Sequence, residues 1–298
     1  MSDIIKEIQS KIGSKILSDY DMGKSTWFRV GGKAKGYTII NNISDLKTII
    51  TYLDRIRYYI IGVGSNLLIR DQGFDGLILK LGRNFNNIKI KNNILSVGAG
   101  VLDLNLAKFA TKNSIKDFEF FTGIPGTIGG AVKMNAGCYG SQTADNLKRI
   151  LVLNKFGKIK YLNSGKLELD YRSSRIDEKS IILQADFKFQ YASKSEIIDK
   201  NNYIKFRRQT SQPIKEKTSG STFKNPSGEF AAVLIEKAGC KGMKIGDASV
   251  STIHSNFIIN NGEATALDIE NLGKSIIRKV QEKFGITLEW EIKILGKS

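Results

Sequence analysis

The stretch "FTGIPGTIGGAVKMNAGCYG", residues 121–140, decides the fold. Glycines at 123, 126, 129, 130 and 137 leave a long run of backbone without side chains, and Pro125 stiffens its start. Such a backbone can approach a large, flat ligand, although tight turns near a domain junction would use the same residues. A second glycine stretch, "IGVGSNLLIRDQG" (residues 61–73), follows a predicted strand. Two such loops on adjacent βα units favour one extended, diphosphate-bearing cofactor.

The shorter loop does not fit a standard nucleotide fingerprint. Gly62 and Gly64 begin a Gly-x-Gly-x-x-Gly pattern, but Leu67 occupies the third glycine position and no long helix follows. The chain also has no Walker pattern, which argues against a nucleotide hydrolase. Ser65 and Asn66 complete a turn whose N–H groups can still point together at an anion.

Length and composition indicate a soluble globular protein of two or three domains. The 298 residues are 41% hydrophobic and 25% charged, and no apolar run approaches the ~18 residues of a membrane helix. Charges interrupt the N-terminal apolar clusters, so a secretory signal is not expected. Two cysteines and one histidine cannot build a structural zinc site. We therefore expect a reducing, cytoplasmic compartment.

The net charge of +17 raises the possibility of a polyanionic partner. The lysines, however, are scattered singly among Ile and Asn, as an AT-rich coding bias would produce. The densest basic cluster, residues 205–217, suits a small anionic ligand better than a duplex. A nucleic-acid-binding protein would interleave aromatic residues with lysines on one surface, whereas most Phe and Tyr here lie in apolar-patterned segments.

Beyond an N-terminal helix and connector (residues 1–20), the pattern alternates between α and β. We expect a helix over residues 43–56 with Ser44 as its N-cap, and a hairpin turning at Asn92 and Asn93. Gln212-Pro213 marks a boundary. The expected domains are residues 1–81, 82–206 and 207–298, with a closing strand over 286–295.

Seven motifs occur in the order found in the UDP-N-acetylenolpyruvoylglucosamine reductase family. They are "STWFRVGGKA", "GVGSNLLIRDQGFDG", "GIPGTIGGAVKMNAGCYG", "LDYRSSRI", "SGSTFKNP", "AGCKGMKIGDASVSTIHSNFIIN" and "FGITLEWEIKILG". The resemblance covers residues 25–296. It implies an α+β FAD-binding fold of the vanillyl-alcohol-oxidase (PCMH) type, with two FAD-binding subdomains (1–81 and 82–206) and a substrate-binding domain (207–298) whose last strand returns towards the flavin site.

The resemblance also implies a reaction in peptidoglycan precursor synthesis. NADPH passes hydride to N5 of FAD, and the reduced flavin passes it to C3 of the enolpyruvyl group of the UDP-sugar. C2 then needs a proton to give UDP-N-acetylmuramate. No histidine in the glycine loops could attach flavin, so FAD is expected to be non-covalent. Nucleic acid and membrane insertion are not expected, and the sequence leaves the oligomeric state open.

Three residues match the family's catalytic positions. Arg172 in "YRSS" suits a carboxylate that gains enolate charge, and Ser221 in "SGSTF" matches the proton donor. In "LEWEI" the two carboxylates Glu289 and Glu291 alternate along a strand, so the pattern alone leaves open which one reaches the site. The resemblance selects Glu291. The joint presence of this set argues against an FAD oxidase acting on another alcohol or sugar.

The remaining candidate residues bind ligands. The predicted cofactor-binding residues are Gly62, Gly64, Ser65, Asn66, Gly123, Ile124, Pro125, Gly126, Thr127, Gly129, Gly130, Ala131, Asn135, Ala136 and Gly137. The predicted substrate-binding residues are Lys224, Asn225, His254 and Arg208. Some family members carry an insertion with a tyrosine over the substrate's diphosphate. The compact segment from Ser221 onward has no room for it, so this chain resembles the short, type II members.

Overall fold

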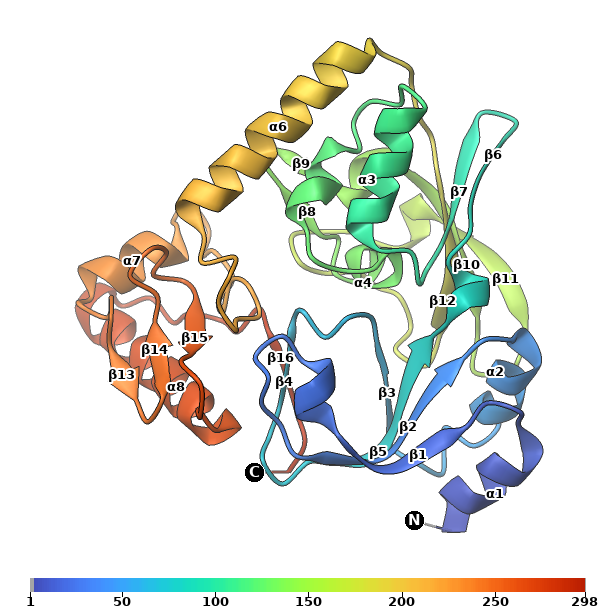
Figure 1. Cartoon of the computed structure of the whole chain (residues 1–298), viewed down its shortest axis with the longest axis horizontal. Helices are drawn as coiled ribbons and strands as arrows, with labels where there is room; N and C mark the ends of the chain where they lie inside the picture. Colours follow the sequence, from blue (N-terminus) through green and yellow to red (C-terminus); the bar gives the residue numbers. More distant parts are fainter. Residues whose placement is uncertain (1–2, 298) are drawn as a thin grey trace. The chain divides into compact units, whose positions relative to one another are not determined.

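The computed structural model describes residues 3–297 (Figure 1). The chain divides into two compact units. Unit 1 contains the N-terminal segment up to Ser18, Lys35–Gly62 and Gly76–Arg207. Unit 2 contains Asp19–Ala34, Val63–Asp75 and the chain from Arg208 onward. The three-domain division expected from the sequence stays a prediction.

Unit 1 contributes most of a four-stranded sheet with the order β1-β2-β5-β3. Its strands are β1 (Ile16–Asp21), β2 (Lys33–Ile40), β5 (Phe74–Leu81) and β3 (Tyr58–Ile61). Two helices, α1 (Asp3–Lys11) and α2 (Ile43–Ile50), pack on it. Ile5 and Ile8, three residues apart, lie on the buried face of α1, and Leu46 and Ile49 do the same in α2.

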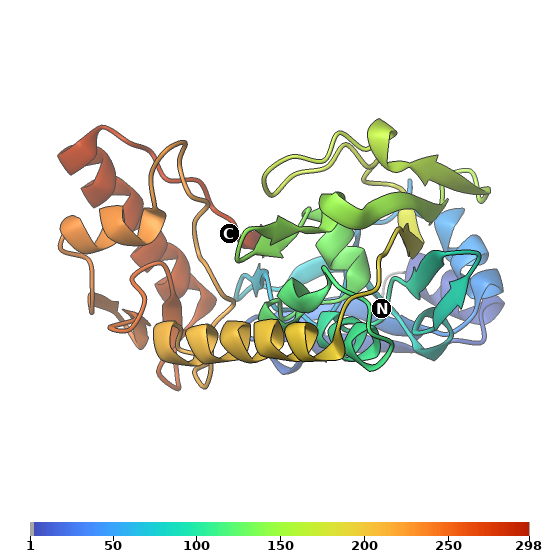
Figure 2. The same cartoon turned by 90° about the horizontal axis from the view of Figure 1, so that it is seen from above.

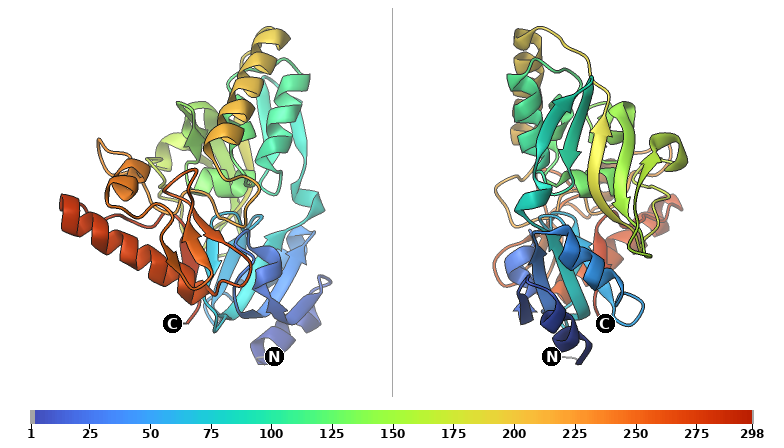
Figure 3. Two further views of the ribbon diagram at one scale, coloured as in Figure 1. Left: turned by 60° about the vertical axis from the view of Figure 1, so that its left-hand side comes forward. Right: turned by 90° about the vertical axis from the view of Figure 1, so that its right-hand side faces the viewer.

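The second sheet of unit 1 has the order β11-β10-β12-β7-β6, and Figure 3 shows its strands side by side. The strands are β6 (Ile88–Lys91), β7 (Ile94–Gly98), β10 (Leu147–Leu153), β11 (Ile159–Asn163) and β12 (Ile181–Phe187). The β6–β7 hairpin turns at Asn92 and Asn93, both with positive φ, as predicted. The helical elements are η2 (Arg83–Phe85), α3 (Asp103–Lys112), η3 (Glu119–Gly123) and α4 (Ile128–Lys133). Phe118, Phe121 and Phe187 pack in this core.

Shorter elements complete unit 1. They are β8 (Gly137–Cys138), β9 (Ser141–Gln142), α5 (Thr143–Asn146) and η4 (Ser164–Lys166). The long helix α6 (Lys194–Ser211) is continuous in Figure 2 and ends one residue before Gln212-Pro213, where a boundary is predicted. Among residues 3–297, no helix combines the length and the apolar character needed to cross a membrane.

Unit 2 is built around α8 (Ala266–Phe284), which contacts every strand of the small sheet β13-β14-β15 (Figure 3). The other elements of this unit are η1 (Met22–Ser25), β4 (Leu67–Ile69), α7 (Ala231–Lys237), β13 (Lys244–Ile245), β14 (Ala248–Val250), β15 (Ile258–Asn260) and β16 (Lys293–Leu295). A capping box of Thr265 and Asp268 starts α8, and Gly285, with φ +69°, ends it. Parallel pairing of β16 with β4 ties the C-terminal segment to the second half of the shorter glycine stretch, residues 61–73.

Three expectations about local structure are corrected. The N-terminal connector contains strand β1. The helix expected over residues 43–56 is α2, which ends at Ile50 and has Asn42 rather than Ser44 as its N-cap. The closing strand is shorter than residues 286–295, because only Lys293–Leu295 pairs with β4. Upstream of it, Trp290 forms an isolated bridge with Phe223.

Candidate active site

The segment that carries Ser221 follows a glycine whose φ of +76° places Gly220 in the left-handed region. Ser221 is half-buried, and the two residues after it are fully enclosed. Thr222 N–H donates to the carbonyl oxygen of Asn256 at 2.8 Å, and Phe223 N–H donates to the Asn256 side-chain oxygen at 2.9 Å. The backbone on the C-terminal side of the serine is therefore fixed.

The carboxylates of "LEWEI" have different surroundings. Glu291 N–H donates to Thr222 O at 2.9 Å, so the half-buried Glu291 lies beside the serine segment. Glu289 is exposed, its carbonyl accepts from Lys224 N–H, and its carboxylate lies 3.0 Å from Lys224 Nζ. The sequence pattern treated the two acids alike, whereas the fold commits Glu289 to a surface ion pair.

Asn66, in the shorter glycine stretch (residues 61–73), lies beside the Glu291 segment of unit 2. Asn66 Nδ2 donates to Glu291 O at 3.1 Å, and Lys293 N–H donates to Asn66 O at 3.0 Å. Gly64 lies so close to Ser25 that a β-carbon there would be 1.9 Å from the Ser25 carbonyl oxygen. The fold thus brings together Ser221, Glu291 and Asn66, which are far apart in the sequence.

The predicted substrate-binding residues of unit 2 make local contacts. His254 packs edge-on against Phe257, and burial lowers the pKa of His254 below its ordinary value, so the imidazole is neutral at pH 7. Its Nδ1 accepts from the backbone N–H of Asn256 at 3.3 Å. Asn225 Oδ1 accepts from Ala231 N–H at 3.0 Å, and Arg208 Nε donates to Gln212 Oε1 at 3.2 Å.

In unit 1 the long glycine loop lies directly against its neighbours. A β-carbon on Gly62 would lie 2.5 Å from Thr127 Oγ1, so the two glycine loops meet at this point. Gly129 N–H donates to the Ala99 carbonyl at 2.8 Å, and a β-carbon on Gly129 would be 3.2 Å from that residue. Because these residues are glycines, the backbone of the loop packs closely against its neighbours.

Arg172 is at the tip of a two-residue turn of unit 1. Asp170 and Ser173 exchange backbone hydrogen bonds across this turn, and Arg172 has a positive φ of +52°. Its guanidinium donates to Gly137 O at 3.1 Å and lies 5.0 Å from the Tyr171 ring centre. A non-glycine residue in this conformation is strained, which is common where a side chain must be presented in one direction.

Asn135 is used within the fold. Its amide nitrogen donates to Gln142 Oε1 and to Asp170 O, and its oxygen accepts from Ala144 N–H. These contacts attach the Arg172 turn to the glycine loop. A cofactor contact by the Asn135 side chain stays a prediction. In the structure this side chain holds the Arg172 turn in place.

Two buried residues were not anticipated from the sequence. Asp103, at the start of α3, is fully buried beside Gly126, and neither of its carboxylate oxygens has a hydrogen-bond partner among the described residues. Burial raises the pKa of Asp103 well above its ordinary value. Asn256 is the second residue, and its contacts come from a turn 35 positions after Ser221, so no local pattern announces them.

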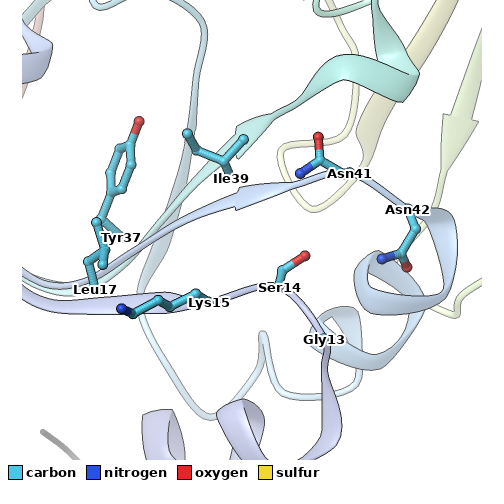
Figure 4. A pocket seen from close by; sticks show the side chains of 8 residues that line it. All are labelled: Gly13, Ser14, Lys15, Leu17, Tyr37, Ile39, Asn41 and Asn42. Atoms are coloured by element: carbon cyan, nitrogen blue, oxygen red, sulfur yellow. The ribbon is translucent and has the colours of Figure 1, made fainter.

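One pocket lies away from the predicted site residues. A pocket of about 610 Å³ opens beside β1 and β2 in unit 1 (Figure 4), and no predicted site residue lines it. Its lining residues are Gly13, Ser14, Lys15, Leu17, Tyr37, Ile39, Asn41 and Asn42. Within residues 3–297, no cluster of three or more His, Cys, Asp or Glu could hold a metal ion.

Comparison with known proteins gives matches over nearly the whole chain. An FAD binding domain model matches residues 34–163, and the model of the UDP-N-acetylenolpyruvoylglucosamine reductase C-terminal domain matches residues 212–295. The UDP-N-acetylenolpyruvoylglucosamine reductases of Rickettsia conorii and Rickettsia typhi are each 45% identical over 280 residues, covering 94% of this chain and 95% of theirs.

A solved structure agrees with the sequence matches. The crystal structure of UDP-N-acetylenolpyruvylglucosamine reductase from Thermus caldophilus superposes with a TM-score of 0.83 at 32% identity, covering 95% of this chain and 99% of the other. The α+β FAD-binding fold expected from the motifs is thus confirmed, together with the resemblance that predicted it. The chain belongs to the UDP-N-acetylenolpyruvoylglucosamine reductase family.

Proposed function

We propose that this protein is an FAD-dependent oxidoreductase of peptidoglycan precursor synthesis. In this proposal it reduces the enolpyruvyl group of UDP-N-acetylglucosamine enolpyruvate to give UDP-N-acetylmuramate, with NADPH as the reductant. Family membership and the FAD binding domain support the reaction class. One observation carries the residue-level proposal: the backbone that follows Ser221 is fixed on one edge by Asn256 and on the other by the segment that contains Glu291.

The glycine loops fit an FAD. Gly62 and Thr127 meet at a distance that only glycine permits, so two stretches of nearly bare backbone adjoin one another. Thr127 adds a hydroxyl group. The N–H groups of Ile124, Gly129 and Ala131 are used within the fold, so we propose that N–H groups of other glycine-loop residues bind the diphosphate. When bound, FAD supplies hydride transfer from NADPH to C3 of the enolpyruvyl group. We propose that binding is non-covalent.

Ser221 is proposed to give the proton that C2 requires. A serine hydroxyl is a weak acid, but the carbanion it faces is far more basic, so no histidine is needed to activate it. What the protein must supply is position, and the contacts of Thr222 and Phe223 with Asn256 provide it. Ser221 itself is half-buried, which limits competing water.

Arg172 and Glu291 are proposed to complete the catalytic set. A planar, permanently charged guanidinium suits a carboxylate that takes up enolate charge, and the turn at Asp170–Ser173 presents it from a rigid base. Glu291 is the carboxylate whose backbone pairs with Thr222, while Glu289 is paired with Lys224 at the surface. Lys224, Asn225, His254 and Arg208 are proposed to bind the UDP-sugar.

The compartment is a further part of the proposal. Cys138 and Cys240 are free thiols, which is the usual state in a reducing compartment, and we propose that the protein acts in the cytoplasm. We also propose that it is a short-form member in which other residues replace the tyrosine insertion over the diphosphate.

The decisive experiment separates the two half-reactions in the Ser221→Ala variant. We expect flavin reduction by NADPH to stay close to wild type, and flavin reoxidation by the enolpyruvyl substrate to slow by about 10² to 10⁴. Stopped-flow absorbance of the flavin follows both steps. Equal losses in both would mean that the serine supports the fold rather than the protonation. A purified protein that takes up no FAD would overturn the proposed function as a whole.

A further inference from the structure

The backbone of Phe223 has no neighbouring strand on one side, and the side chain of Asn256 takes that place. Asn256 Oδ1 accepts from Phe223 N–H at 2.9 Å, and Asn256 Nδ2 donates to Phe223 O at 2.8 Å. The backbone carbonyl of Asn256 accepts from Thr222 N–H at 2.8 Å. Three hydrogen bonds therefore join one residue to the two that follow Ser221.

These contacts are enclosed, so they cannot be exchanged for water. Asn256 is 3% exposed and Phe223 is 1% exposed. Among the side chains only an amide offers a donor and an acceptor in one plane at this spacing, which reproduces the pattern of a strand partner. Removing the amide would leave the N–H and C=O of Phe223 buried and unpaired, a state that proteins rarely tolerate.

The position of Asn256 is itself fixed. Ser251 Oγ accepts from the backbone N–H groups of Ile253 and His254, Phe257 N–H donates to His254 O, and His254 Nδ1 accepts from Asn256 N–H. The turn is therefore rigid where it meets the serine segment.

The peptide unit between Thr222 and Phe223 also connects to the segment that contains Glu291. Thr222 O accepts from Glu291 N–H, so Thr222 is held between the Asn256 turn and Glu291. On the N-terminal side, Gly220 is left-handed, and Ser219 before it is 3% exposed and donates its hydroxyl to Leu67 O at 3.5 Å. The contacts on the Thr222 side are the ones that connect Ser221 directly to Glu291.

We propose that Asn256 is a positioning residue for proton delivery by Ser221, acting through the backbone of Thr222 and Phe223. This inference rests on the proposed function, in which Ser221 is the proton donor. Asn256 does not touch the reacting atoms in this proposal, and its effect is confined to the half-reaction that needs the proton.

The test uses the FAD-loaded full chain carrying Asn256→Ala, with UDP-N-acetylglucosamine enolpyruvate as oxidant. We expect reoxidation of the reduced flavin to slow by about 10²-fold, because small misplacements of a reacting group cost rate on this scale. Reduction by NADPH is expected to change little. The solvent deuterium isotope effect on reoxidation should rise, because proton transfer becomes more rate-limiting, whereas a smaller fraction of folded enzyme would leave it unchanged.

A milder variant and a matched control guard against simple misfolding. Asn256→Gln keeps the amide donor and acceptor on a side chain that is one methylene longer, so its loss should fall between those of wild type and alanine. Asn260 is also 3% exposed, and its side chain bonds to Phe28 O, Gly262 N–H and Ala264 N–H instead of the serine segment. Asn260→Ala should lower the melting temperature without favouring one half-reaction.

The double variant Ser221→Ala/Asn256→Ala separates this inference from the proposed function. If Asn256 acts through Ser221, the double variant reoxidises no more slowly than Ser221→Ala alone. A slow Ser221→Ala variant beside a normal Asn256→Ala variant would overturn this inference alone. A normal Ser221→Ala variant would overturn the proposed role of the serine. Equal slowing of both half-reactions by Asn256→Ala would reduce Asn256 to a fold-stabilising residue.

Discussion

The stability of unit 2 should depend on one enclosed carboxylate, Glu270 of α8. Arg70 Nε and Nη2 donate to its two oxygens at 2.8 and 3.1 Å, and Lys274 Nζ lies 2.9 Å away. Arg70 also donates to Gly296 O, and its backbone N–H donates to Leu295 O. The ion pair therefore joins α8 to the paired strands β4 and β16. We predict that Glu270→Gln destabilises unit 2.

The size of the effect follows from the titration of the carboxyl group. Hydrogen bonds from Arg70, followed by those from Lys274 and the charges of both, lower the pKa of Glu270 from 4.5 to about 2. The Glu270 side chain is 8% exposed, so solvent screening is small. At about 1.4 kcal/mol per pKa unit, the carboxylate contributes about 3 kcal/mol to the free energy of unfolding. This contribution is fully present above pH 4.5 and is lost as the pH falls towards 2.

The assay can be confined to the relevant unit. Both tryptophans of the chain, Trp27 and Trp290, belong to unit 2, so tryptophan fluorescence in urea reports its unfolding. We expect Glu270→Gln to lower the unfolding free energy at pH 7 by about 3 kcal/mol, and the difference from wild type to shrink below pH 4.5. Glu282→Gln, in an exposed pair with Arg278 on the same helix, should cost at most about 0.5 kcal/mol. Similar losses for the two variants, or a pH-independent loss for Glu270→Gln, would refute the reasoning.

Two further predictions concern unit 1. The raised pKa of Asp103 means that stability falls as the pH rises from the ordinary pKa of an aspartate through the higher folded-state pKa. Asp103→Asn removes this titration, so circular dichroism melts of the variant should lose this part of the pH dependence; an unchanged slope would argue against it. Gly62→Ala would place a β-carbon 2.5 Å from Thr127 Oγ1 and should weaken FAD binding to the apoprotein by about tenfold, or roughly 1–2 kcal/mol, in a flavin fluorescence titration. Gly13→Ala is its control, because no atom lies within 4 Å of the added carbon. Equal FAD affinities of the two variants would contradict the prediction that the two glycine loops bind one FAD.

Periodic elements could be predicted from sequence because their signals are local. Helix α8 has its apolar face, capping box and terminal glycine within one continuous segment. The hairpin at Asn92 and Asn93 likewise needs only its own residues. The predicted N-cap of α2, Ser44, was wrong because Asn and Ser are equally suited to this position. The hydrogen bond from Asp45 N–H to Asn42 Oδ1 makes Asn42 the N-cap.

The site could be predicted only in part, because its geometry is non-local. The family resemblance predicts Ser221 and Glu291 as catalytic residues, but the alternating pattern alone could not separate Glu291 from Glu289. That separation comes from pairing with residues 222–224, which lie far away in the sequence. The closing strand was predicted too long for the same reason, since its partner changes from the serine segment to β4 between Glu291 and Lys293.

A serine that donates a proton to a strong base differs from a serine that attacks. A nucleophile needs a partner that removes its proton, and the fold would then have to place a histidine or another base beside it. A donor needs only to be at the right distance when the carbanion forms, so the requirement passes from side-chain chemistry to backbone geometry. In the proposed function, unit 2 meets that requirement with buried hydrogen bonds to Thr222 and Phe223. The one histidine of the chain, His254, serves as a neutral acceptor for a backbone N–H. Substitutions that disturb these bonds should therefore affect protonation before they affect the flavin.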